Sequence, residues 1–232
     1  MFLNSIRVKC RLCSRLSYEL REFFGALFVG INCRSVALAS GAQTPSKRVD
    51  EFNQAAPNCQ CEQFRTSKFS PHPVKNSEVL TRFIFSPLHV RKNGELKPSL
   101  FTHVETSGCS VQREHLATNA ELSPWVQRFL FNQDKQSWFG TVSALSSDIR
   151  EVALSQSANR AFAVYDTAER NNPAHAEVFQ TQYVVDEADR IELRAEIMKK
   201  FGGGKITKPD HYRSGAVWNG LGQDIQSRTS TV

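Results

Sequence analysis

The chain has 232 residues, of which 40% are hydrophobic and 22% are charged. This composition is typical of a folded globular protein and excludes a collagen-like or wholly disordered chain. The formal net charge is +6, but residues 1–48 hold eight basic and two acidic side chains, residues 199–232 hold six and two, and residues 49–198 carry −4. The two basic ends, and not the centre, are therefore suited to bind nucleic acid or another acidic partner.

Residues 1–60 are predicted to be a basic, cysteine-containing extension or linker. They include the apolar run at residues 23–31, which is too short to cross a bilayer, so we expect no transmembrane segment and a cytoplasmic protein. Three interpretations stay open: an amphipathic or targeting segment, a poorly ordered extension, or a start codon placed upstream of the true one.

Cysteine usage argues against a disulfide framework for the centre of the chain. Five of the six cysteines lie in the first 61 residues, and Cys109 is the remaining one. Cys10 and Cys13 have C-x-x-C spacing, but no second pair of comparable spacing and no nearby histidine completes a zinc set. We therefore expect no cofactor and no metal.

The first predicted strand of the core covers residues 82–90, where Pro87 suggests an edge or a bend. The dipeptide Asn93-Gly94 then predicts a type I′ hairpin turn, because that turn needs positive φ at both central positions. A further strand is expected at residues 99–108. Residues 109–117 are expected to pass from a loop into a strand or the start of a helix.

The second half of the core alternates helices and strands without a regular β-α-β repeat. A helix is predicted at residues 123–131, where a serine N-cap precedes a proline. Residues 137–145 are predicted to be a strand. The capping residues that open the next segment predict a helix with Ile149, Val152 and Ala153 on one face.

Two more strands and a helix complete the predicted core. The apolar run at residues 160–166 and the alternating run at residues 175–185 both have strand character. Residues 186–201 have acids at their start and lysines at their end, as a helix dipole favours, with Ile191, Ala195 and Met198 on one stripe.

These elements together predict an α+β fold. We expect a mainly antiparallel sheet with a few helices packed on one face, in a single domain at residues 64–201. Residues 202–232 are expected to form a basic, glycine-rich tail, and both ends of the chain are expected to be loosely ordered.

The stretch around His175 predicts an acid–base patch. On a strand, positions i and i+2 share a face, so His175 and Glu177 project together. If residues 160–166 pair with the strand that begins at His175, Asp166 adds a second carboxylate nearby. An imidazole beside carboxylates is a plausible general base. The alternative is a turn in which Asp166 only satisfies its own backbone.

Arg113 and Ser110 are the predicted ligand-binding residues. They follow the small-residue break at Gly108, where backbone N–H groups and a guanidinium can converge on an anion. Cys109 would be a nucleophile only if a histidine such as His103 lowered its pKa.

A different site could be built from strand histidines. His89, His103 and His175, together with Glu177, would supply ligands for a transition metal, although their spacing does not demand it.

The C-terminal tail carries a short tyrosine, arginine, tryptophan and glycine pattern, made up of Tyr212, Arg213, Trp218, Gly220 and Gly222. Over about a dozen residues it resembles the DNA-binding loop of the histone-like nucleoid-structuring family. Asn219 and Gln223 depart from that pattern, Gln223 standing where the family has the arginine that enters the minor groove, and the family's proline is absent. The resemblance implies DNA binding by this segment.

Two functions of different classes follow from these observations. In the first, the chain is a small soluble enzyme, a hydrolase or a transferase, that acts on a phosphorylated or nucleotide-like ligand through the His175 patch with Arg113 as the anion grip. In the second, it is a non-catalytic protein whose basic tails bind nucleic acid or an acidic partner.

Overall fold

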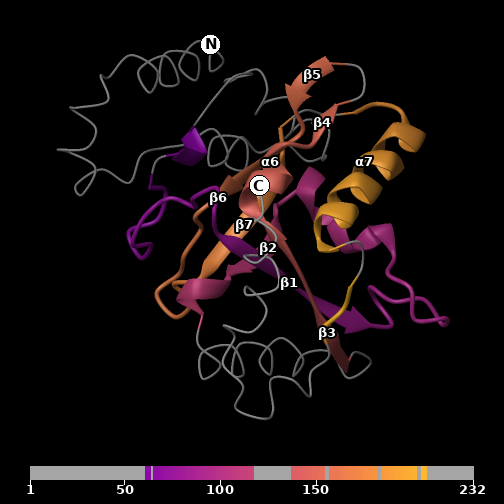
Figure 1. Ribbon diagram of the computed structural model, residues 1–232, viewed down its shortest axis with the longest axis horizontal. Coiled ribbons are helices and arrows are strands. Elements are labelled where there is room, and N and C mark those ends of the chain that lie inside the picture. The colour runs from indigo at the N-terminus through magenta and orange to yellow at the C-terminus, as the bar shows by residue number, and fades with distance from the viewer. Residues whose placement is uncertain are drawn as a thin grey trace, which may run out of the picture.

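The computed structural model describes residues 61–63, 65–117, 137–154, 157–181, 184–202 and 205–207 (Figure 1). The helix expected at residues 123–131 and most of the two basic ends lie outside these residues. Five antiparallel strands form the main sheet in the order β3-β1-β2-β7-β6, and β4 pairs with β5 in a second, two-stranded sheet. The strands are β1 (Val79–Ser86), β2 (Cys109–Arg113), β3 (Ser137–Leu145), β4 (Ala153–Leu154), β5 (Ser157–Arg160), β6 (Phe162–Tyr165) and β7 (His175–Gln180).

Within the described residues, two α-helices and three 3-10 helices accompany the strands, so the expected α+β class with an antiparallel sheet is confirmed. Figure 1 shows α7 beside η2, and α6 lies against β6. No described helix is long and apolar enough to cross a membrane. The helices are η1 (Cys61–Gln63), η2 (Pro98–Glu105), η3 (Glu114–Leu116), α6 (Ser146–Arg150) and α7 (Glu187–Lys200).

The hydrophobic core lies on one face of the sheet, where alternate side chains of each strand meet η2 and α7. Phe101 of η2 packs against Phe201, which follows α7, with ring centroids 4.9 Å apart. Burying these side chains supplies most of the driving force for folding. The core includes Leu80 and Ile84 of β1, Val111 of β2, Val142 of β3, Val164 of β6, Ala176 and Val178 of β7, and Leu193 and Ile197 of α7.

Helix α7 forms where its sequence signals predicted. Asp186 is the N-cap, and its carboxylate accepts hydrogen bonds from the backbone N–H groups of Ala188 and Asp189. The predicted apolar stripe needs correction, because Ile191 is 48% exposed while Leu193 and Ile197 face the core. Met198 of the expected stripe is partly buried and packs against the core, so the buried stripe shares Met198 with the prediction but is rotated away from Ile191.

The strand expected at residues 99–108 is wrong, because the chain there forms η2. Pro98 occupies the first turn, and the buried side chains Leu100, Phe101 and Val104 recur with helical spacing. Alternation along a strand would separate these apolar side chains onto two faces, whereas the helix buries them together.

The predicted turn at Asn93-Gly94 is present but is not of type I′. Gly94 has a φ of +88°, whereas no described residue other than glycine has positive φ. The N–H of Gly94 bonds to the carbonyl of Arg91 at 3.0 Å, and the N–H of Arg91 bonds to the carbonyl of Glu95 at 2.8 Å. The turn therefore uses one left-handed residue, a common alternative in hairpins.

The predicted helix after Leu145 is shorter than expected. It ends at Arg150, and the chain continues into β4, where Ala153 is exposed. Ile149 within the helix and Val152 just after it are both buried, as the predicted spacing required. The strands expected at residues 137–145, 160–166 and 175–185 appear as β3, β6 and β7. The strand expected at residues 82–90 appears as β1, but it begins earlier, at Val79, and ends at Ser86.

Candidate functional site

The strand pairing expected around His175 is confirmed. Strand β7 begins at His175 and runs antiparallel to β6, which ends at Tyr165, directly before Asp166. Tyr165 and Glu177 are partners in this ladder.

A row of polar side chains crosses the sheet on the face opposite the core. In the ladder, Thr81 pairs with both Ser143 and Gln112, and Gln112 pairs with His175. Residues directly opposite one another on neighbouring strands share a face. We call Ser143, Thr81, Gln112 and His175 the polar row.

Three members of the polar row have hydrogen-bond partners and one does not. The hydroxyls of Thr81 and Ser143 lie 2.8 Å apart. Nδ1 of His175 lies 2.9 Å from the hydroxyl of Thr167 and 3.1 Å from its carbonyl oxygen. Gln112 is fully buried, and within the described part of the chain neither its side-chain oxygen nor its nitrogen has a partner. An unpaired buried amide is costly, so this one needs an explanation.

Two other predicted site residues lie on the same face as the polar row. Ser110 pairs with Glu177, and both residues are partly buried. Glu177 packs over Gly108, where an added Cβ would lie 3.1 Å from its carboxylate oxygen. The sheet thus brings together His175, Glu177 and Ser110, as the i and i+2 argument predicted for the first two.

Arg113 lies on the other face, and this corrects the expected site. Gln112 is the partner of His175, so the next side chain, that of Arg113, points to the core side. Asp166 belongs to the Arg113 side as well. Its carboxylate accepts a hydrogen bond from the N–H of Thr66 at 2.8 Å, and burial raises its pKa, opposed by hydrogen bonds from Thr66 and Ser70. In this arrangement Arg113 and His175 cannot serve one reacting group.

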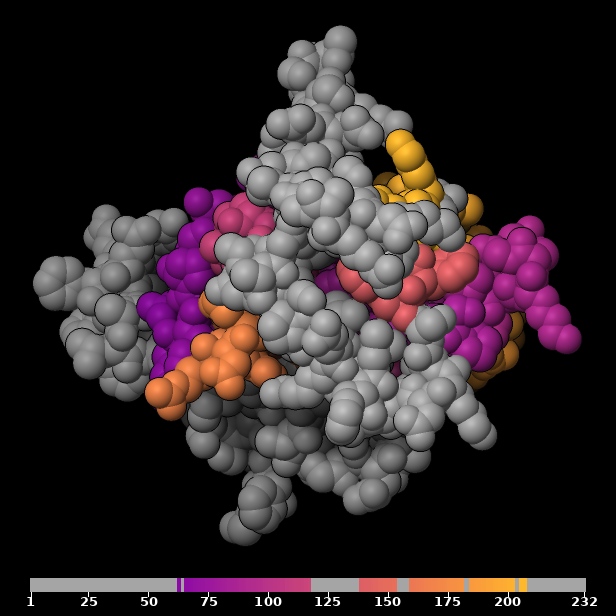
Figure 2. Space-filling view, turned by 90° about the horizontal axis from the view of Figure 1, so that it is seen from below, coloured from indigo at the N-terminus to yellow at the C-terminus, as the bar shows by residue number. Residues whose placement is uncertain are grey.

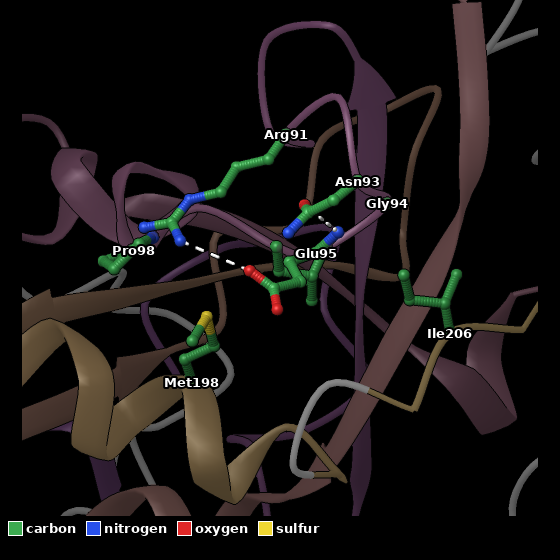
Figure 3. Close-up of a pocket in the computed structure, with 8 residues that line it drawn as sticks. Arg91, Asn93, Gly94, Glu95, Pro98, Met198 and Ile206 are labelled. Carbon is green, nitrogen blue, oxygen red and sulfur yellow. Dashed lines mark hydrogen bonds and ion pairs between the residues drawn. The ribbon is translucent and has the colours of Figure 1, made fainter.

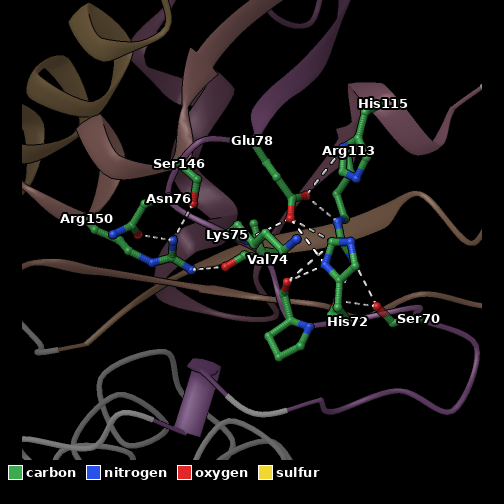
Figure 4. Close-up of polar contacts among 11 residues, drawn as sticks. Ser70, His72, Val74, Lys75, Asn76, Glu78, Arg113, His115, Ser146 and Arg150 are labelled. Atoms are coloured by element: carbon green, nitrogen blue, oxygen red, sulfur yellow. Dashed lines mark hydrogen bonds and ion pairs between the residues drawn. The ribbon is translucent and has the colours of Figure 1, made fainter. Parts of the chain in front are cut away.

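Arg113 is the centre of a buried polar cluster at the end of β2 (Figure 4). Its Nε and Nη2 donate to the two oxygens of Glu78, at 2.7 and 2.9 Å. Nη1 donates at 2.9 Å to both the hydroxyl of Ser70 and the carbonyl of His72, and Nη2 lies 2.8 Å from Nδ1 of His72. Every guanidinium nitrogen thus has a hydrogen-bond partner within the protein. Arg113 therefore fixes the loop before β1, and its guanidinium is not open to bind an anion.

Two histidines flank the Glu78 carboxylate in this cluster. The Nδ1 atoms of His72 and His115 lie 3.5 and 3.6 Å from its oxygens, and the rings stack with centroids 5.8 Å apart. Burial lowers the pKa of His115, partly offset by Glu78. Sequence analysis missed His72 and Glu78, because nothing in their spacing indicates that a loop returns beside η3.

The other candidate residues do not form a second centre. The Cys109 thiol is fully buried, and burial raises its pKa, which makes it a poor nucleophile. His89 accepts a hydrogen bond from the N–H of Phe85 at 3.1 Å, and burial lowers its pKa to about 3. Within the described ranges, the group of three metal-type ligands that converges is His72, Glu78 and His115, and not the strand histidines.

A pocket of about 590 Å³ lies between the turn after β1 and the end of α7 (Figure 3). Leu96, Pro98, Met198 and Ile206 form its apolar lining, and an ion pair between Arg91 and Glu95 lies at its side. Figure 2 shows the magenta residues of this part of the chain projecting at the right-hand edge of the molecule. The lining has no histidine or cysteine, so we do not place the chemistry here.

Comparison of the chain with protein-family models, with curated proteins and with solved structures finds no match. Fold and geometry define an α+β protein with two clusters of polar side chains on opposite faces of one antiparallel sheet.

Proposed function

We propose that the chain is a small enzyme that binds a nucleotide-like ligand at the polar row, on the face of the sheet opposite the core cluster, and acts on it by acid–base catalysis through His175 and Glu177. The observation that carries the proposal is the Gln112 amide, which is buried beside His175 without a partner among the described residues.

The chemistry of an unpaired glutamine amide limits the ligand. Its oxygen accepts and its nitrogen donates, so it is complementary to a group that presents a donor next to an acceptor. The edge of a nucleobase has that pattern, and glutamine pairs with adenine in this manner. Such a ligand would satisfy the two atoms that the protein leaves unpaired.

His175 has the orientation that a general base requires. In the proposed mechanism the ring donates from Nδ1 to the carbonyl oxygen of Thr167, which can only accept, and Nε2 takes the proton from the substrate. Glu177, two residues along the same face, supplies a carboxylate for a second proton transfer. Hydrolysis or group transfer on the phosphorylated part of the ligand is the reaction class that such a pair serves.

The test uses three probes and two variants. Adenosine and AMP should raise the melting temperature of the wild-type chain, whereas ribose 5-phosphate, which lacks the base, should not. Gln112→Met removes the amide but keeps the volume, so it should stabilise the ligand-free chain by about 1 kcal/mol and abolish the response to both probes. Failure of AMP and adenosine to raise the melting temperature of the wild-type chain would contradict the proposal.

His175→Asn separates binding from catalysis. The variant should still bind AMP. Chromatography of the reaction mixture should show that the variant no longer releases phosphate or base from AMP. Its melting point should fall only slightly, by the equivalent of about 1 kcal/mol for the lost bond to Thr167. Unchanged turnover would remove His175 from the mechanism.

A further inference from the structure

The cluster on the core side of the sheet has the composition of a metal centre. His72 precedes β1 in a loop, Glu78 lies directly before β1, and His115 lies in η3 directly after β2. Because β1 and β2 are antiparallel, with Leu80 opposite Arg113, the start of one and the end of the other meet at the same end of the sheet. The fold therefore delivers three ligand-type side chains to one place.

We infer that His72, Glu78 and His115 form a binding site for a divalent transition metal of the zinc type. One ligand atom from each residue lies within 4.8 Å of the others. In a tetrahedral zinc site, with metal–ligand bonds near 2.0–2.1 Å, ligand atoms are about 3.3 Å apart.

The two imidazoles are accessible to an ion from solvent. The side chains of His72 and His115 are 31% and 45% exposed, whereas that of Glu78 is 5% exposed. Three protein ligands at an exposed edge leave a coordination position open for water, as in catalytic and not structural zinc sites.

The buried carboxylate is held in place by groups that do not bind metal. Arg113 donates to both oxygens of Glu78, and the N–H of Lys75 donates to Oε1 at 2.7 Å. Partners of this kind orient a ligand before the metal arrives. Nη2 of Arg113 lies against Nδ1 of His72, so this histidine would use its Nε2 or a flipped ring.

The positive charge of Arg113 also influences which metal ion the site would prefer. It neutralises the one carboxylate of the cluster, so the site lacks the several anionic oxygens that Mg²⁺ and Ca²⁺ require. Two imidazoles favour zinc, nickel or copper instead. The same positive charge weakens attraction for any dication, so we expect weaker binding than in a closed four-ligand site.

The experiment titrates the full chain, stripped of metal with a chelator, with ZnCl₂ by calorimetry and with CoCl₂ by absorption spectroscopy. The wild type should bind one zinc ion that His115→Ala weakens by at least about tenfold, since a ligand contributes no less than a supporting partner. His72→Ala should have the same effect. His103→Ala removes an exposed histidine of η2 and is the matched control, for which no change is expected.

Cobalt spectra separate this site from binding by cysteines. Cobalt at nitrogen and oxygen ligands gives visible bands without the strong near-ultraviolet band of a thiolate complex. Absence of zinc binding by the wild type, equal binding by His115→Ala, or a thiolate band as the main signal would each overturn the inference. The readout is metal binding alone, so it stands apart from any result with AMP.

Discussion

Gln112 and Arg113 are neighbours in β2, both fully buried, and they differ completely in their hydrogen bonding. Every guanidinium nitrogen of Arg113 donates to a protein acceptor on one side of the sheet, while on the other side neither polar atom of the Gln112 side chain has a partner in the part of the chain that the structure describes. The free-energy cost of burying Arg113 is offset within the chain, and that of Gln112 is not. This contrast marks Arg113 as a residue that supports the structure and Gln112 as a candidate ligand-binding residue.

Removing Arg113 should destabilise the protein strongly. Arg113→Ala leaves the Glu78 carboxylate buried without its partner, and breaking a buried pair from one side costs about 3–5 kcal/mol. Urea denaturation of the wild type and of Arg113→Ala measures the difference in their free energies of unfolding. Arg91→Ala is the control, because its ion pair with Glu95 is exposed and contributes about 0.2–1 kcal/mol. Equal effects of the two substitutions would contradict the supporting role of Arg113.

Gly140 should not tolerate a side chain. Its φ is +151°, and an added Cβ would lie 2.4 Å from the carbonyl oxygen of Thr207. Gly140→Ala should therefore disrupt the bridge in which Thr141 and Thr207 exchange backbone hydrogen bonds at 2.9 Å, with a loss of at least about 1–3 kcal/mol. Chemical denaturation measures the loss.

Gly94→Ala is the matched control for this position. Gly94 also has positive φ, but an added Cβ meets nothing within 4 Å. Only backbone strain remains, about 1–2 kcal/mol. If Gly94→Ala lowered the free energy of unfolding more than Gly140→Ala does, the contact with Thr207 could not be the reason that position 140 needs glycine.

His89 should make the protein less stable in acid. Burial lowers its pKa from 6.5 to about 3, with help from Arg82, His103 and Lys97. Below pH 6.5 His89 is protonated in the unfolded chain but stays neutral in the folded chain down to about pH 3. The free energy of unfolding is therefore greatest above pH 6.5 and falls by about 4 kcal/mol as the pH approaches 3. His89→Gln keeps an acceptor for the N–H of Phe85 and should flatten this part of the stability profile. A profile identical to that of the wild type would exclude His89 as its source.

Binding of nucleic acid through the basic ends should depend strongly on salt. Residues 1–48 and 199–232 carry net charges of +6 and +4. Binding through such charges releases counterions, so affinity for a short DNA duplex should fall steeply between low and physiological salt. Fluorescence anisotropy measures this. Affinity independent of salt, or full affinity of residues 64–201 alone, would exclude the tails as the binding elements.

The sequence by itself determined the features that depend on neighbouring residues. The caps and charges of residues 186–201 were enough to predict α7, and the two runs around His175 were enough to predict a hairpin, because both rest on local backbone preferences. Alternation likewise placed His175 and Glu177 on a common face. The strand expected at residues 99–108 failed because a helix buries its apolar side chains together, whereas a strand would separate them onto two faces.

Only the tertiary structure decided which residues of neighbouring strands lie opposite one another in the sheet. Strands β2 and β7 are distant in the chain, and a shift of one residue in their pairing would place Arg113, and not Gln112, beside His175. The same holds for Glu78, which is 35 residues from Arg113 yet forms its ion pair. Periodicity along one strand fixes which of its residues share a face. Which face meets the core, and which distant partners meet there, follows from the packing of the whole chain.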